Sequence, residues 1–200
     1  KETDPIVTLT TGVMVREVVD EAIKGDNHYK VNRNMKVLSL DGDGSQLSMW
    51  ISAAMDMEND SVYHPRELFK EITENVGFPP PTSQGGCQDK VLITDCMLDN
   101  WYVTADWQSA AILHLIDNRE LDVVFSHFHA IDLQSHMIIR YLTDKGFNKL
   151  PPADFVKFLE DVYIQADYYL GKFLHYLDEG WTIFVLSDHG LILSLIHISE

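Results

Sequence analysis

Two places along the chain combine an aspartate with a histidine directly after an apolar run. Asp132 and His136 form the first pair, and Asp188 and His189 form the second. Carboxylate oxygen suits hard divalent cations, and zinc also accepts imidazole nitrogen. Two such cations about 3.5–4 Å apart can hold the entering and leaving oxygens of a phosphoryl transfer. These four residues are therefore candidate metal ligands, and their types and number suit half of such a site.

The spacing of the first pair predicts a shared helix face. Asp132 and His136 are four positions apart, so a helix that begins near Asp132 places both on one side. His127 and His129 alternate with Phe128, so we predict that both imidazoles share one face of a strand. His129 lies nearer to the end of that strand, where it could contact substrate or orient a metal ligand. The alternative is that both are polar residues at a strand end.

Either pair by itself also has a plain structural interpretation. An Asp-x-x-x-His spacing occurs often by chance, and an aspartate after a strand commonly caps a helix. The two pairs occur in order, each after an apolar run, and their joint occurrence favours metal binding. In open α/β sheets the active site lies beyond the carboxyl ends of the strands, where both pairs would fall.

The elements that must position these pairs alternate between strands and helices. Leu121–Ser126 and Trp181–Leu186 are apolar and rich in β-branched residues, which is typical of buried parallel strands. Val91–Thr94 predicts a further short strand, Ala105–Ile116 a helix, and Pro152–Leu177 a long amphipathic helix. This alternation predicts an α/β fold with a parallel-sheet core and flanking helices.

The first third of the chain predicts other elements. Apolar residues recur at helical spacing from Val13 to Ala22, which predicts a short helix that ends at Gly25. Lys36–Leu40 and Gln46–Ile51 flank Asp41–Gly44, which predicts two strands joined by a tight turn. We interpret this part as a small N-terminal α+β insert or cap.

A helix and a loop follow this insert. Pro65–Val76 predicts a helix that begins at a proline and is stopped by Gly77. Pro79–Gly86 breaks regular structure and marks a boundary. We therefore divide the chain into an α+β module at residues 1–88 and part of a metal-binding core at residues 89–192.

The last eight residues, Leu193–Glu200, differ in character from the rest of the chain. They resemble one frame of a sequencing adapter, so we interpret them as an adapter-derived tail; the alternative is a native strand. We expect the chain to be truncated at both ends. The sequence does not fix the compartment, although the cytoplasm is favoured for a soluble chain without a signal-peptide pattern.

Composition narrows the class of protein. The 200 residues are 46% hydrophobic, and 15 basic against 31 acidic residues give a net charge of −16. So negative a chain is not expected to bind a nucleic-acid polymer, because the phosphate backbone would be repelled. No apolar run is long enough to span a bilayer. Cys87 and Cys96 could be thiols or one disulfide, and their spacing leaves both open.

An aromatic cluster is the remaining feature with a possible binding role. Trp101, Tyr102 and Trp107 could stack on a base or sugar. The alternative is ordinary aromatic packing between helices.

Three segments together carry a resemblance to a known family. Phe125–Tyr141, Ala166–Gly171 and Ser187–Gly190 resemble the type I phosphodiesterase/nucleotide pyrophosphatase branch of the alkaline phosphatase superfamily. The resemblance extends over about residues 121–191 and is faint before them. It implies an alkaline phosphatase-like fold and a site that holds two divalent metal ions, Zn²⁺ by resemblance with Mn²⁺ as the alternative.

The resemblance also implies roles for single residues. Asp132 and His136 would bind one zinc ion, and Asp188 and His189 the other. The Thr or Ser nucleophile and a further metal-binding Asp would precede Lys1, and another metal-binding His would follow the truncation. The fragment itself is therefore expected to bind metal poorly and to catalyse little.

The implied activity is hydrolysis of phosphate esters. The expected substrate is a phosphorylated small molecule, with a nucleotide as one possibility. The alternatives are a phosphomutase or sulfatase of the same superfamily, or a non-catalytic binding domain on which the acid–imidazole pairs serve as caps.

Overall fold

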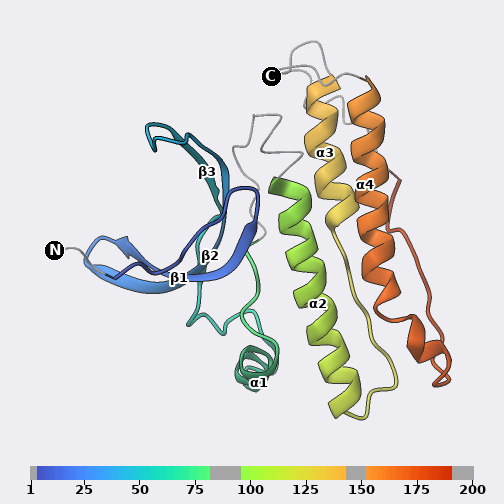
Figure 1. Ribbon diagram of the computed structural model, residues 1–200. Helices are drawn as coiled ribbons and strands as arrows, with labels where there is room; N and C mark the ends of the chain where they lie inside the picture. Colours follow the sequence, from blue (N-terminus) through green and yellow to red (C-terminus); the bar gives the residue numbers. More distant parts are fainter. Residues whose placement is uncertain (1–3, 82–95, 143–151, 191–200) are drawn as a thin grey trace. The chain divides into compact units, whose positions relative to one another are not determined.

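The computed structural model describes residues 4–81, 96–142 and 152–190, and Figure 1 shows their course. The chain divides into two compact units. Lys1–Cys87 with Asp99–Glu120 form the first unit, and Gln88–Leu98 with Leu121–Glu200 form the second. The predicted division at residue 88 stays a prediction.

Several predicted features lie outside the described residues. They are the strand Val91–Thr94, most of the loop Pro79–Gly86, the side chain of Cys87 and the tail Leu193–Glu200. Cys96 lies within the described part of the chain and is buried.

The first unit is built on an antiparallel sheet whose long middle strand is β2. β1 (Met14–Lys24), β2 (Asn27–Leu40) and β3 (Leu47–Ile51) follow one another in the sheet, and β4 (Met55–Asp56) also pairs with β2. Each of these strand pairings is antiparallel. Figure 1 shows β1 and β2 as one long curved ribbon of two strands.

The predicted hairpin between the second and third strands is confirmed. The backbone N–H of Asp41 donates to the carbonyl of Gln46 at 3.0 Å, and that of Gly44 donates to the carbonyl of Asp41 at 2.9 Å. Gly44 has a φ of 72°, which favours glycine. The short Asp-Gly segment therefore reverses the chain as the sequence indicates.

The helix predicted between Val13 and Ala22 is wrong, because residues 14–22 belong to β1. The strand register shifts between Val15 and Val18, which marks a β-bulge. After the bulge the less exposed residues are Val18, Asp20 and Ala22, whereas before it the adjacent Met14 and Val15 are both half-buried. This change breaks the period of two and makes the apolar spacing imitate that of a helix.

Two helices complete the first unit. α1 (Glu67–Asn75) and α2 (Leu98–Asn118) confirm the helices predicted there, and α2 extends beyond the predicted helix at both ends. The stop at Gly77 is also confirmed, since Gly77 has a φ of 108° and its N–H donates to the carbonyl of Ile72 at 3.1 Å.

A buried polar network ties β2 to α2 inside the first unit. The side-chain amide of Asn34 donates to Oδ1 of Asn100 at 2.7 Å, and that of Asn100 donates to the carbonyl of Pro81 at 3.0 Å. Lys36 reaches Asp99 with 2.6 Å between Nζ and Oδ2. The first unit also buries apolar side chains, among them Val18, Val31, Met35, Val37, Ile72, Trp101 and Ala105.

The second unit is helical in its described part. α3 (Ala130–Leu142) and α4 (Pro152–Gly171) pack against each other, as Figure 1 shows, and a 3-10 turn, η2 (Leu174–Leu177), follows. The helix predicted to run to residue 177 therefore ends earlier, at Gly171. Gln134 on α3 donates to Oε1 of Gln165 on α4 at 2.8 Å, and both side chains are fully buried.

The predicted α/β fold with a parallel-sheet core is wrong, because the described residues form an α+β chain with an antiparallel sheet. Leu121–Ser126 and Trp181–Leu186, predicted as buried strands, form no strand. Within them Phe125 is 91% exposed and Leu186 is 83% exposed. A β-branched apolar run indicates strand propensity, but a sheet also requires neighbouring strands to supply hydrogen bonds.

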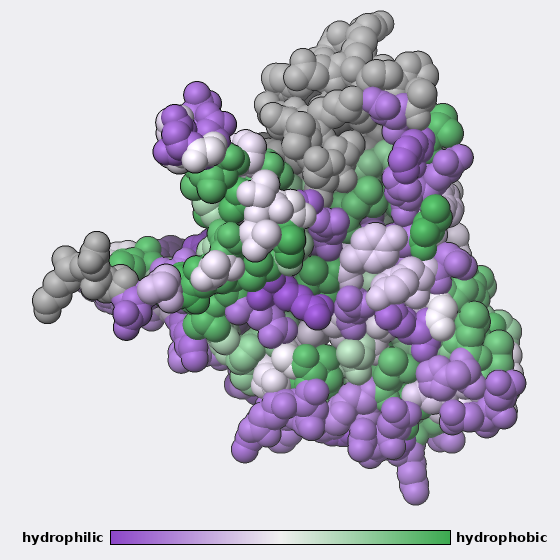
Figure 2. All heavy atoms as spheres, viewed as in Figure 1, coloured by the Kyte–Doolittle hydropathy of each residue, from purple (hydrophilic) through white to green (hydrophobic). Residues whose placement is uncertain are grey.

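The surface of the described residues mixes hydrophobic and hydrophilic side chains. Figure 2 shows both kinds interspersed over the face it presents. None of the described helices combines the length and the apolar character that a membrane crossing needs.

Candidate metal-ligand cluster

The first predicted pair lies at the beginning of α3. Asp132 is in the first turn of this helix, and His136 follows one turn later. Nε2 of His136 lies 3.1 Å from Oδ1 of Asp132, and Nε2 of His129 lies 2.8 Å from Oδ2 of the same carboxylate. Asp132 thus has an imidazole on each of its two oxygens. This arrangement brings three candidate residues together, and their role as ligands stays a prediction.

An aromatic stack holds the segment that enters α3. The ring of Phe128 lies 4.3 Å from that of Tyr169 at an angle of 11°, so the two rings are stacked. The rings of His127 and His129 lie 4.8 Å apart, so the two imidazoles share a side although no strand forms there. The side chains of His127 and His129 therefore lie on the same side of the segment, as their alternation with Phe128 predicts.

Tyr169 is a positioning residue that sequence reasoning missed. Its hydroxyl lies 2.6 Å from Oγ of Ser126. Burial raises the pKa of Tyr169, and the hydrogen bond with Ser126 opposes this. Tyr169 was part of a segment that supported the family resemblance, but nothing in the spacing indicates that its ring packs on residue 128.

The second predicted pair lies at the end of the described chain. Nε2 of His189 lies 3.6 Å from Oδ2 of Asp188, and the backbone N–H of His189 donates to Oδ1 of Asp188 at 3.0 Å. Oγ of Ser187 donates to the carbonyl of His189 at 2.5 Å. Nδ1 of His189 lies 3.0 Å from the carbonyl of Gly190. These short-range contacts give the segment a defined local shape, while the side chains of Asp188 and His189 stay exposed.

The electrostatics of His189 link the two pairs. Its pKa is raised chiefly by the hydrogen bond to the Gly190 carbonyl, and next by the charge of Asp188. The carboxylate of Asp132 adds a smaller contribution in the same direction. The two acid–imidazole pairs of the second unit therefore interact electrostatically.

The residues fit a divalent cation in type, since carboxylate oxygen and imidazole nitrogen are its usual protein ligands. Their arrangement, however, does not form a ready-made metal site. Across residues 4–81, 96–142 and 152–190, no group of three or more histidine, cysteine or acidic side chains is placed to hold a metal ion. In the cluster, the nitrogens of His129 and His136 face the carboxylate of Asp132.

Comparison with known proteins leaves the family open. No protein-family model matches the chain, and neither a curated protein nor a solved structure matches it.

Proposed function

We propose that this chain carries part of the metal-binding site of a hydrolase that acts on phosphate esters, of the phosphodiesterase or nucleotide pyrophosphatase kind. The observation that carries the proposal is the pair of imidazoles on Asp132, at 2.8 and 3.1 Å, within the electrostatic reach of a second acid–imidazole pair. The proposal rests on these side chains and on the sequence resemblance, and it uses no parallel sheet.

The two pairs have distinct parts in this proposal. Asp132 and His136 would hold one divalent cation, and Asp188 and His189 would hold the other. His129 contacts the carboxylate oxygen opposite His136, so it fixes how Asp132 is turned and adds an imidazole beside the substrate. The stack of Phe128 on Tyr169 holds the segment that carries His129.

The net charge of the chain makes cations necessary for this substrate class. A charge of −16 repels a phosphate ester unless positive charge is present in the site. Divalent cations, when bound, would offset the negative charge on the phosphoryl oxygens and polarise the phosphorus–oxygen bonds. Zn²⁺ is the first candidate by ligand type, and Mn²⁺ is the alternative.

A hydroxyl nucleophile is the part of the proposal that the described residues do not supply. We propose that a Thr or Ser outside the described residues supplies it. The substrate would be a phosphorylated small molecule, such as a nucleotide. The 200-residue chain itself is then expected to bind metal weakly and to leave phosphodiesters unhydrolysed.

The test is a calorimetric zinc titration of the 200-residue chain. Wild type should bind zinc, and Asp132→Asn and Asp188→Asn should each weaken binding by about tenfold or more, because each removes a charged ligand. A parallel assay with bis(p-nitrophenyl) phosphate should show no turnover by any of these proteins.

The matched control is another acid–imidazole pair on the same chain. Nδ1 of His28 lies 2.8 Å from Oε1 of Glu21 on the first unit, and both side chains are exposed. Glu21→Gln changes the net charge as Asp132→Asn does, but it should leave zinc binding unchanged. Equal zinc binding by wild type, Asp132→Asn and Asp188→Asn would overturn the proposal.

A further inference from the structure

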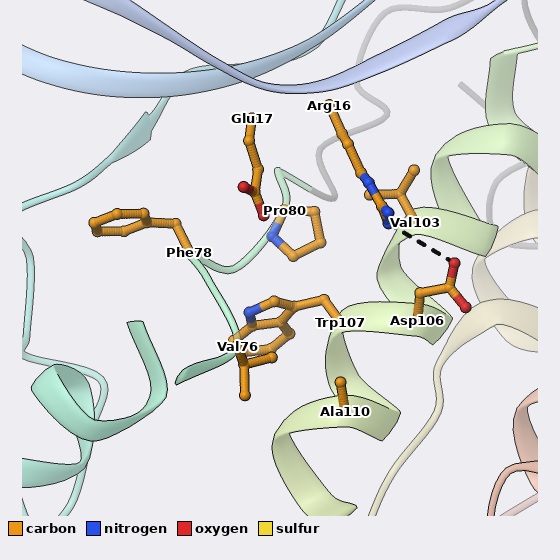
Figure 3. A pocket seen from close by; sticks show the side chains of 9 residues that line it. All are labelled: Arg16, Glu17, Val76, Phe78, Pro80, Val103, Asp106, Trp107 and Ala110. Atoms are coloured by element: carbon orange, nitrogen blue, oxygen red, sulfur yellow. Dashed lines mark ion pairs between the residues drawn. The ribbon is translucent and has the colours of Figure 1, made fainter. Parts of the chain in front are cut away.

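A cavity of about 400 Å³ opens on the first unit, and its lining includes none of the residues of the proposed metal site. Its walls come from β1, from the segment that follows α1, and from α2. Figure 3 shows the lining side chains, which are Arg16, Glu17, Val76, Phe78, Pro80, Val103, Asp106, Trp107 and Ala110. This volume lies in the range of small-molecule sites, about 300–1,000 Å³.

One wall of the cavity is apolar and centred on Trp107. The indole N–H of Trp107 donates to the carbonyl of Gly77 at 2.9 Å, which fixes the ring. Val103 and Ala110 lie about one turn to either side of it on α2, so they continue the same helix face. Figure 3 shows Pro80 across from the indole. A flat apolar ligand could lie on this wall.

The bulge in β1 gives the cavity a carboxylate. Glu17 has a φ of 57°, a left-handed conformation that residues with side chains rarely adopt. Such conformations persist where the surroundings enforce them, and they cluster at functional sites. The bulge turns Glu17 toward the segment after α1, as Figure 3 shows.

Gly77 makes room for this carboxylate. A Cβ atom added at Gly77 would lie 2.7 Å from Oε1 of Glu17, which is closer than real Cβ contacts allow. The absence of a side chain at residue 77 therefore lets the carboxylate stand at the cavity wall. The same glycine accepts the hydrogen bond that holds Trp107.

The charges at the cavity favour a cationic ligand. Nη1 of Arg16 lies 3.8 Å from Oδ2 of Asp106, so the positive and negative charges of this ion pair offset each other. Glu17 adds a second carboxylate, and the lining as a whole carries one net negative charge. The Glu17 carboxylate can attract an ammonium group through charge, and the indole of Trp107 offers an apolar surface in the same cavity.

We propose that this cavity binds a small organic cation whose ammonium group pairs with Glu17 while its apolar body lies against Trp107. The residues of this site differ from those of the proposed phosphoester site, and its ligand is a cation whereas a phosphate ester is an anion. An experiment that contradicts one proposal therefore does not affect the other.

The test uses three probes of similar shape and different charge. Binding of phenethylamine, 2-phenylethanol and 3-phenylpropanoate to the 200-residue chain is measured by ligand-observed NMR at fixed ionic strength. The amine should bind about tenfold more tightly than the alcohol, and the carboxylate should bind most weakly. Equal affinity for amine and alcohol would overturn the proposal without any variant.

Variants then locate the charge that makes the difference. Glu17→Gln should remove the preference for the amine over the alcohol, while Trp107→Ala should weaken both probes. Glu21→Gln, on the same strand but outside the cavity, makes the same change of net charge and should keep the preference. Loss of the preference in Glu21→Gln, or its survival in Glu17→Gln, would contradict the assignment.

Discussion

Nε2 of His136 lies 3.1 Å from Oδ1 of Asp132, one helical turn earlier on α3. His129 contacts the other oxygen of this carboxylate, so the geometry depends on the segment before the helix as well as on the helix itself. The geometry of the cluster therefore depends on the packing that holds this segment and α3 in place.

The Tyr169 hydroxyl is expected to support the cluster from α4. Tyr169→Phe removes the hydrogen bond to Ser126 and should lower the free energy of unfolding by about 0.5–1.5 kcal/mol. Urea denaturation followed by circular dichroism measures this. Tyr168→Phe is the control, because its hydroxyl receives a bond from exposed Lys172 and its loss should cost less. An equal effect of the two changes would contradict a supporting role for Tyr169.

The buried Asn34–Asn100 bond is expected to be a main link between β2 and α2. Asn100→Ala leaves the amide of Asn34 without its acceptor and the carbonyl of Pro81 without its donor. The free energy of unfolding should fall by about 1–3 kcal/mol, as measured by urea denaturation. Asn75→Ala, which removes an exposed bond to the Glu71 carbonyl, should change it by only about 0.5 kcal/mol. Similar losses for both variants would count against the buried network.

A side chain at residue 77 is expected to destabilise the fold. Gly77→Ala introduces a Cβ 2.7 Å from Oε1 of Glu17 at a φ of 108°, so the variant should lose about 1–2 kcal/mol of stability. Chemical denaturation gives the value. Gly42→Ala serves as the control, since a Cβ there has no atom within 4 Å and should cost little. A Gly77→Ala protein as stable as wild type would show that Glu17 can move away without cost.

The interactions of Glu71 predict that the folded protein loses stability as the pH falls. Its pKa is lowered chiefly by the hydrogen bond from Arg119, with a further contribution from His114. Because folding lowers this pKa below the ordinary value of 4.5, the charged carboxylate stabilises the fold above pH 4.5. That contribution is lost as the pH falls through the folded-state pKa. Melting temperatures of wild type and Glu71→Gln should therefore differ at neutral pH and converge in acid. A constant difference down to about pH 3 would contradict the link.

Local sequence signals predicted the local elements. The Asp41–Gly44 turn, α1 with its stop at Gly77, and α2 follow from residues that are neighbours in the chain. The contact between Asp132 and His136 also follows from helical spacing alone. These features depend on interactions within a few residues, which a sequence displays directly.

Features that depend on distant partners were missed. The bulge before Val18 exists because β1 pairs with β2, and it gave the apolar residues of a strand a helix-like spacing. The apolar run before His127 indicated a buried strand, but whether a strand pairs depends on residues elsewhere in the chain. The cavity at Glu17 could not be predicted for the same reason, since the bulge and the distant Gly77 together create it.

The central claim is that Asp132 with His136 holds one divalent cation and Asp188 with His189 holds another. NMR spectra that resolve the imidazole nitrogens test it most directly, recorded while Zn²⁺ is added to the 200-residue chain. The account predicts that the ring nitrogens of His136 shift in wild type and shift far less in Asp132→Asn, that those of His189 shift in both proteins, and that His28 responds in neither. Zinc shifts of His136 that are the same in wild type and Asp132→Asn, or that are as large at His28, would contradict it and favour a non-catalytic binding domain.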